Sequence, residues 1–238
     1  MRLPLRLPVQ VKAQQLLPID ATARDKKHMW KAAVDVVESM QALTAQASQL
    51  VHSTINGAAF VEWDHYPEND VRDSRHHTQY FYHAHPGKQR PFTEHGHFHY
   101  FVHAQELGLR PATTRYEEAP AHIVALSMDA QGIPSGFFIV NRWVTKGPWL
   151  SYRECERALA QFQIRSRTGS PQVNRFLSAC LQLYRQPILE LIAERDRVMQ
   201  KLCAQRDRRS VFADTQIEVI CYRPISLLKD IEALEKSL

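Results

Sequence analysis

Histidine has the most informative distribution of any residue type in this chain. Nine of the twelve histidines lie between His65 and His103. The segment contains the H-x-H pair His83 and His85, and then a run in which His95, His97 and His99 alternate with other residues. Neutral imidazole is a good ligand for zinc, copper, iron and nickel. The pattern therefore predicts a metal site.

Strand geometry explains how these imidazoles can meet. Successive side chains of a strand point to opposite faces, so residues two apart share a face. If residues 79–85 and 95–103 pair as a hairpin, the nine-residue connection sets His85 opposite His95 and His83 opposite His97. Directly opposed Cβ atoms are roughly 4.5 to 5.5 Å apart, which allows imidazoles to share one ion. We expect a divalent transition metal, with zinc or iron favoured, and the ligands His83, His85, His95 and His97, with His99 in reserve.

Carboxylates near the histidines can complete such a site. Glu94 has the opposite parity to His95, so it binds metal only if the strand starts after it or is bulged, and otherwise it orients a ligand. Glu62, Asp64 and Asp70 are further candidates. Three histidines and an open position would let the metal activate water or dioxygen, with Glu94 as catalytic general base. Four bound histidines would make a closed site for structure or metal handling.

Two other interpretations of the chain stay open. A metal-free small-molecule binding module would use a histidine-lined pocket to recognise a polar or anionic ligand, with Arg90, Arg142 and Tyr82 as helpers. An interaction protein would instead use the basic helical part of the chain. A purely structural cluster is less favoured, because every buried ring nitrogen needs a partner.

Several familiar site motifs are absent from the sequence. The glutamate that follows H-x-H in cupins is replaced by Gln89 or Arg90. The motifs H-E-x-x-H, G-x-x-x-x-G-K-[ST], G-x-G-x-x-G and G-x-S-x-G do not occur. Assignment as a zincin, nucleotide-binding protein or serine hydrolase therefore has no support.

Five strings carry a resemblance to a known family: DHYPENDV, QYFYHAHP, EHGHFHYFV, NRWVT and FADTQIEVI. From about Ala58 to Ile225 the chain resembles an uncharacterised bacterial family, a domain of unknown function. The resemblance implies no activity. It implies that the signature positions of the family are Tyr82, His83, His85, Glu94, His95, Gly96, His97 and His99.

The rest of the sequence indicates the elements that position these residues. Apolar residues at three- and four-residue spacing predict a helix from Thr22 to about Val51, which Asn56-Gly57 ends. Ala58 to Trp63 reads as a short strand, and Asp64 to Ser74 as a polar loop that contains His65.

The second half of the chain predicts one more hairpin and then helices. Residues 123–128 and 137–144 are expected to pair, and helices are expected to begin after Ser151 and Ser170. A strand at 216–222 and a helix opened by Ser226 follow. The predicted fold is α+β: a small antiparallel sheet with the histidine hairpin, covered by several amphipathic helices. Residues 1–238 are expected to form a single domain, with 1–20 poorly ordered and 105–120 a surface loop.

Composition narrows the partners and the compartment. The net charge of +5 comes from scattered Lys and Arg rather than a basic stripe, so nucleic acid is not an expected partner. No run of 18 apolar residues is present, so we expect no membrane span. The four cysteines form no C-x-x-C motif and suit a reducing compartment. We expect a cytoplasmic protein that can bind a small molecule, of undetermined oligomeric state.

Overall fold

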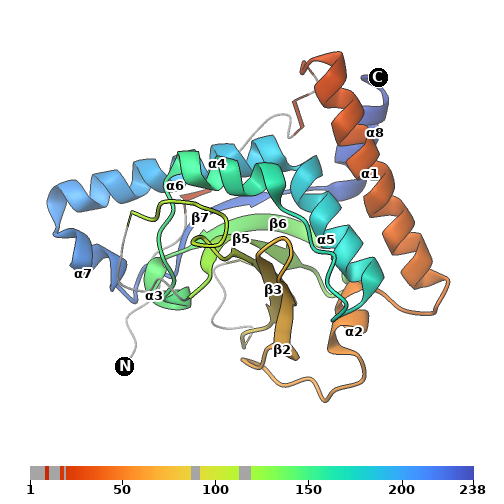
Figure 1. Cartoon of the computed structure of the whole chain (residues 1–238), viewed down its shortest axis with the longest axis horizontal. Helices are drawn as coiled ribbons and strands as arrows, with labels where there is room; N and C mark the ends of the chain where they lie inside the picture. The colour runs from red at the N-terminus through yellow and green to blue at the C-terminus, as the bar shows by residue number, and fades with distance from the viewer. Residues whose placement is uncertain (1–8, 11–16, 19, 87–91, 113–118) are drawn as a thin grey trace.

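The computed structural model describes residues 9–10, 17–18, 20–86, 92–112 and 119–238 (Figure 1). Its centre is a seven-stranded sheet in the order β1-β7-β6-β5-β4-β3-β2. β1 pairs in parallel with β7, and all other neighbours are antiparallel. The strands are β1 (Val9–Gln10), β2 (Tyr66–Asp73), β3 (Thr78–His83), β4 (Gly96–Val102), β5 (Ala121–Met128), β6 (Pro134–Val140) and β7 (Val219–Pro224).

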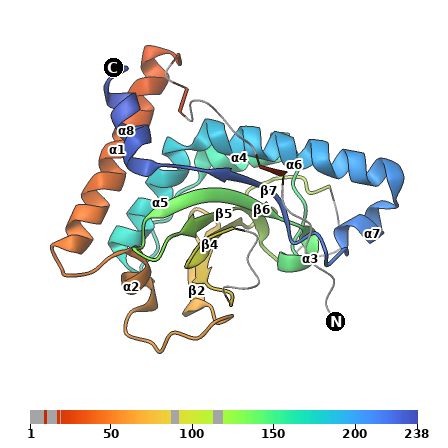
Figure 2. The same ribbon diagram turned by 180° about the vertical axis from the view of Figure 1, so that it is seen from behind.

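The longer helices gather on one side of this sheet. Figures 1 and 2 show α4, α5 and α6 across one face, with α1 and α8 packed together beyond α5. The α+β class is confirmed. The helices are α1 (Ala23–Thr44), α2 (Leu50–Ile55), α3 (Arg142–Thr145), α4 (Tyr152–Gln161), α5 (Pro171–Leu183), α6 (Arg185–Gln205), α7 (Arg208–Phe212) and α8 (Leu227–Glu235).

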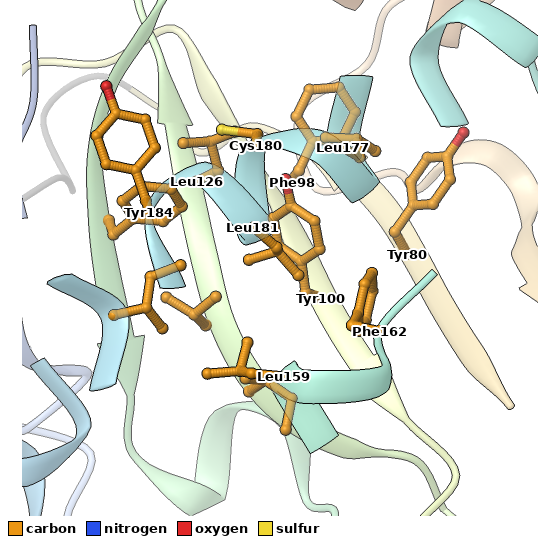
Figure 3. Packing of buried hydrophobic residues seen from close by; sticks show 14 of the residues in the cluster. Tyr80, Phe98, Tyr100, Leu126, Leu159, Phe162, Leu177, Cys180, Leu181 and Tyr184 are labelled. Carbon is orange, nitrogen blue, oxygen red and sulfur yellow. The ribbon is translucent and has the colours of Figure 1, made fainter. Parts of the chain in front are cut away.

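The main hydrophobic core lies between the sheet and these helices. Phe98 and Leu126 from the strands lie beside Leu177, Cys180 and Leu181 of α5 (Figure 3). All five side chains are fully buried. Burying each large apolar side chain contributes roughly 1.5 to 3 kcal/mol, so this face of the sheet is strongly specified. Because strand side chains alternate, the residues on either side of Phe98 point to the opposite face.

The helix predicted from Thr22 to Val51 is two helices. α1 ends at Thr44, Ala47 has a left-handed φ of 51°, and α2 starts at Leu50. The Gln49 side chain begins α2 by accepting a hydrogen bond from the Val51 amide at 2.7 Å. Asn56 ends it in the left-handed conformation, as the Asn-Gly pair predicts.

The predictions for residues 58–74 were wrong. Ala58 to Trp63 is not a strand, whereas Tyr66–Asp73, inside the predicted loop, forms edge strand β2 against β3. The pairing shifts register between Tyr66 and Val71, which marks a bulge. Pro67 is compatible with a strand here because proline is tolerated at edges and bulges.

The helix starts predicted after Ser151 and Ser170 are confirmed. Ser151 accepts a hydrogen bond from the Glu154 amide, and Ser170 accepts one from Val173. Pro171 occupies the first turn of α5. The Glu154 carboxylate accepts a hydrogen bond from the Arg110 amide at 3.1 Å instead of returning to Ser151.

The predictions for residues 1–20 and 105–120 fall partly outside the described residues. Within the described part, Val9–Gln10 joins the sheet and Leu109 is buried. All four cysteines are free, and three of them are buried. No helix in the described ranges combines the length and apolar character that crossing a bilayer would need.

A pair of leucine substitutions tests the position of the core. Leu126→Ala should lower the free energy of unfolding by about 2 to 5 kcal/mol, because a fully buried side chain is lost. Leu228→Ala in α8, where the side chain is 67% exposed, should change it by less than about 0.5 kcal/mol. Urea unfolding followed by circular dichroism measures both, and equal losses would contradict this core.

Candidate metal centre

The histidine hairpin has the predicted register at its central pair. β3 and β4 are antiparallel with His83 opposite His97 and Phe81 opposite His99. Phe98 and Tyr100 face the helices, so His97 and His99 lie on the other face of the sheet together with His83. The ladder ends at the His83 pair, and His85 follows in the chain segment just beyond β3.

Four imidazoles meet through their Nε2 atoms. The Nε2 of His83 is 2.8 Å from that of His97 and 3.1 Å from that of His85. The Nε2 of His99 is 3.1 Å from that of His97. Two ligands of a tetrahedral zinc ion lie about 3.3 Å apart when each is bonded at ~2.0 to 2.1 Å. Shifts of a few tenths of an ångström would therefore fit these nitrogens to one ion.

The cluster is almost shielded from solvent. The exposed fractions are 9% for His83, 7% for His85, 3% for His97 and 1% for His99. His83, His85 and His97 place one ring nitrogen each within 4.8 Å of the others, the spacing that a shared ion requires. A buried histidine cluster that can hold a metal is thus present on the strands.

Carboxylates lie near the Nδ1 atoms of two of the rings. Glu94 Oε1 lies 2.8 Å from Nδ1 of His97, with both side chains buried. Glu218 Oε1, just before β7, lies 3.5 Å from Nδ1 of His85. A carboxylate at Nδ1 holds the ring proton there, so the Nε2 atom of the neutral ring is left with a lone pair.

His99 has a different partner behind its ring. Its Nδ1 is 2.9 Å from Nε2 of His122 on β5. Burial lowers the pKa of His99 well below its usual value, and the neighbouring histidine charges add to the effect. Burial likewise lowers the pKa of His122 to about 3. Both rings are therefore neutral near pH 7, the form that binds metals.

The number of ring protons limits how many of these contacts can be hydrogen bonds. With lone pairs on Nε2 of His85 and His97, a hydrogen on Nε2 of His83 can point at one of them but not at both. The other contact of about 3 Å is then not a hydrogen bond. A cation at the centre accepts all the lone pairs at once. The geometry of the cluster is therefore compatible with a bound metal ion.

The expected place of His95 needs correction. β4 begins at Gly96, so the alternation of the strand does not extend to His95. Its Nδ1 is 2.6 Å from the hydroxyl of Tyr82, which lies in the helix-side core. His99, the predicted reserve, takes the place beside His97.

Of the candidate carboxylates, only one is found at the cluster among the described residues. Glu94 precedes the strand and contacts His97, which is the orienting arrangement that its parity allowed. Glu62 and Asp64 are exposed, and Asp70 instead contacts His65. Sequence reasoning did not place Glu218 or His122 at the cluster. Neither residue belongs to a local metal-binding sequence motif. His122 comes from β5, and Glu218 comes from the position just before β7.

Of the predicted helpers of a small-molecule pocket, Tyr82 and Arg142 are described, and both make contacts elsewhere. Tyr82 points to the helix side of the sheet, and Nε of Arg142 donates to the Gly147 carbonyl. Arg90 lies outside the described residues.

Gly96 is needed because a Cβ there would meet the Tyr82 hydroxyl and the His83 carbonyl.

A small cavity adjoins the Nδ1 side of the cluster. It has a volume of about 10 Å³, room for about one water molecule. Its walls come from the histidines, the two carboxylates and an apolar patch of β6, β7 and α3: His85, Phe92, Glu94, His97, His99, Phe138, Val140, Val144, Glu218 and Val219.

The comparisons with known proteins extend the resemblance found in the sequence. Residues 30–225 match the model of a family described as Domain of unknown function (DUF6969). The chain belongs to this family. The DUF6969 match begins before Ala58, in α1, and includes the whole histidine cluster. No curated protein and no solved structure matches the chain.

The lowered pKa values of His99 and His122 predict an acid-sensitive fold. The unfolded chain protonates His122 near its ordinary pKa of 6.5, whereas the folded chain does so only at about 3. The unfolded state binds more protons in this window, so stability is full above pH 6.5 and falls as the pH drops toward 3. Each such group contributes at most about 1.4 kcal/mol per pH unit.

Urea unfolding of metal-free protein at pH 7 and pH 5 measures this loss. His122→Gln should show a smaller loss between the two pH values than the wild type. His52→Gln, on the exposed surface of α2, should match the wild type. An unchanged slope in His122→Gln would contradict the depressed pKa.

Proposed function

We propose that this protein binds a divalent transition metal, zinc or iron, through the Nε2 atoms of His83, His85 and His97, with His99 beside them. The observation that carries the proposal is the convergence of these nitrogens at 2.8 to 3.1 Å. A cation accepts the lone pairs of all these nitrogens at once, whereas a hydrogen on one of them can point at only one neighbour.

The groups behind the rings support the same proposal. Ligating histidines commonly donate Nδ1–H to a carboxylate, which fixes the tautomer and makes Nε2 a better ligand. Glu94 and Glu218 stand where that role requires them. We therefore propose that Glu94 orients His97, since its Oε1 is engaged behind the ring rather than in front of the Nε2 atoms.

A metal-free binding module is supported less well. The cavity beside the cluster holds about 10 Å³, whereas pockets for organic ligands usually measure about 300 to 1,000 Å³. An ion fits between the histidines, and an organic ligand does not fit within the cavity that the described residues enclose. The free cysteines are compatible with the proposed cytoplasmic location.

Metal content tests the proposal directly. Tag-free protein purified without added metal should contain near-stoichiometric metal by plasma mass spectrometry. The double variant His85→Ala, His97→Ala should lose it, because two converging nitrogens are removed. The matched double variant His28→Ala, His52→Ala, which changes exposed histidines, should keep it.

Circular dichroism of the variants shows whether loss of metal follows loss of the fold. A folded double variant without metal supports the centre. Wild-type protein that holds no metal after incubation with zinc, iron, copper and nickel salts would overturn the proposal.

Glu94→Gln tests the orienting carboxylate. We expect zinc affinity to fall about 10- to 100-fold, because the neutral amide no longer holds the proton on Nδ1 of His97. Competition titration against a chromophoric chelator measures the affinity. Glu62→Gln removes the same charge from an exposed position nearby and should leave zinc affinity unchanged. Equal losses in the two variants would point to general electrostatics instead.

A further inference from the structure

The segment before β2 places two rings at the edge of the histidine cluster. Trp63 stacks on His85 with ring centroids 4.3 Å apart, and its side chain is 50% exposed. His65 stacks on Phe81 with centroids 3.6 Å apart and an interplanar angle of 9°. The His65 side chain is 43% exposed, so it borders both the cluster and solvent.

His65 is held by a carboxylate. Its Nδ1 lies 3.1 Å from Oδ1 of Asp70, and Oδ2 of Asp70 accepts a hydrogen bond from Gln79 at 2.7 Å. Gln79 in turn contacts Nε2 of His103 at 3.0 Å through its own Oε1. Asp70 is thus held in place by Gln79, and its carboxylate accepts the Nδ1–H of His65.

The order of residues along β3 sets the direction of the other ring nitrogen. On this face β3 presents Gln79, Phe81 and then His83. Asp70 contacts both Gln79 and Nδ1 of His65, so Nε2 lies on the side of the His65 ring away from Asp70. The His65 and His83 rings are 5.7 Å apart and edge to face.

The backbone around this pair departs from regular strand structure. The β2–β3 pairing shifts register between Tyr66 and Val71, and Asp70 has a left-handed φ of 52°. Bulges that re-aim a side chain are frequent beside active sites. This one turns the Asp70 carboxylate toward His65.

We propose that His65, oriented by Asp70, accepts a hydrogen bond from a small molecule bound at the metal centre. This inference rests on the proposed metal site and adds a ligand position in front of His83, His85 and His97. The ligand class is a small polar molecule with a hydrogen-bond donor next to the atom that contacts the metal. His65 then selects such ligands over equally sized ones that lack the donor.

Two small probes test the selection on protein reconstituted with cobalt(II). Acetohydroxamate keeps an N–H donor beside its oxygen atoms, whereas acetate has none. Their dissociation constants follow from changes in the visible cobalt spectrum. In His65→Phe, which preserves a ring for stacking on Phe81, acetohydroxamate should bind about three- to tenfold more weakly, the effect of one hydrogen bond. Acetate should bind as in the wild type.

Asp70→Asn should show the same selective loss, because an amide can also donate to His65 and no longer fixes its proton on Nδ1. His52→Phe, a remote exposed histidine, should bind both probes like the wild type. Equal weakening of both probes in His65→Phe would overturn the proposal, because that pattern reflects a disturbed centre.

Cobalt content is measured before the probes are added, which separates this inference from the proposed function. Cobalt-loaded wild-type protein that binds neither probe would mean a closed centre, and it would overturn the role of His65 while the metal site stands. Failure to load cobalt, zinc or iron would overturn both.

Discussion

The pairing of β3 with β4 in one register is the constraint on which the candidate centre depends. A shift of one residue would move His97 and His99 from their face into the helix-side core and expose Phe98 and Tyr100. Those two aromatic residues are fully buried beneath α5. The hydrophobic core on one face of the sheet therefore holds the histidines together on the other.

The two faces of the sheet carry different kinds of side chain. The helices on one face supply the large apolar core, which leaves the opposite face available for polar groups. A smaller apolar cluster from β5, β6 and β7 lies there beside the histidines and includes Phe138. The Phe138 ring contacts His97 edge to face at a centroid distance of 4.9 Å, so this patch limits the movement of the ring and excludes water.

The groups around the histidines orient or neutralise three of the four rings. Glu94 and Glu218 direct the protons of two rings away from the centre, and burial keeps His99 neutral. On the solvent side, Trp63 and His65 border the cluster from a segment that precedes edge strand β2. The centre is thus closed on the sheet side and bordered by aromatic rings where ligands would approach.

The sequence alone determined the α+β class, the hairpin and the His83–His97 pair, because these depend on local alternation and on a short connection between strands. It did not determine the place of His95, since β4 begins at Gly96 and Nδ1 of His95 contacts the hydroxyl of Tyr82 from β3. Glu218 lies far along the chain and reaches His85 only because β7 joins the sheet beside β6. The edge strand β2 was hidden because its polar residues resemble a loop, and only pairing with β3 satisfies their backbone groups.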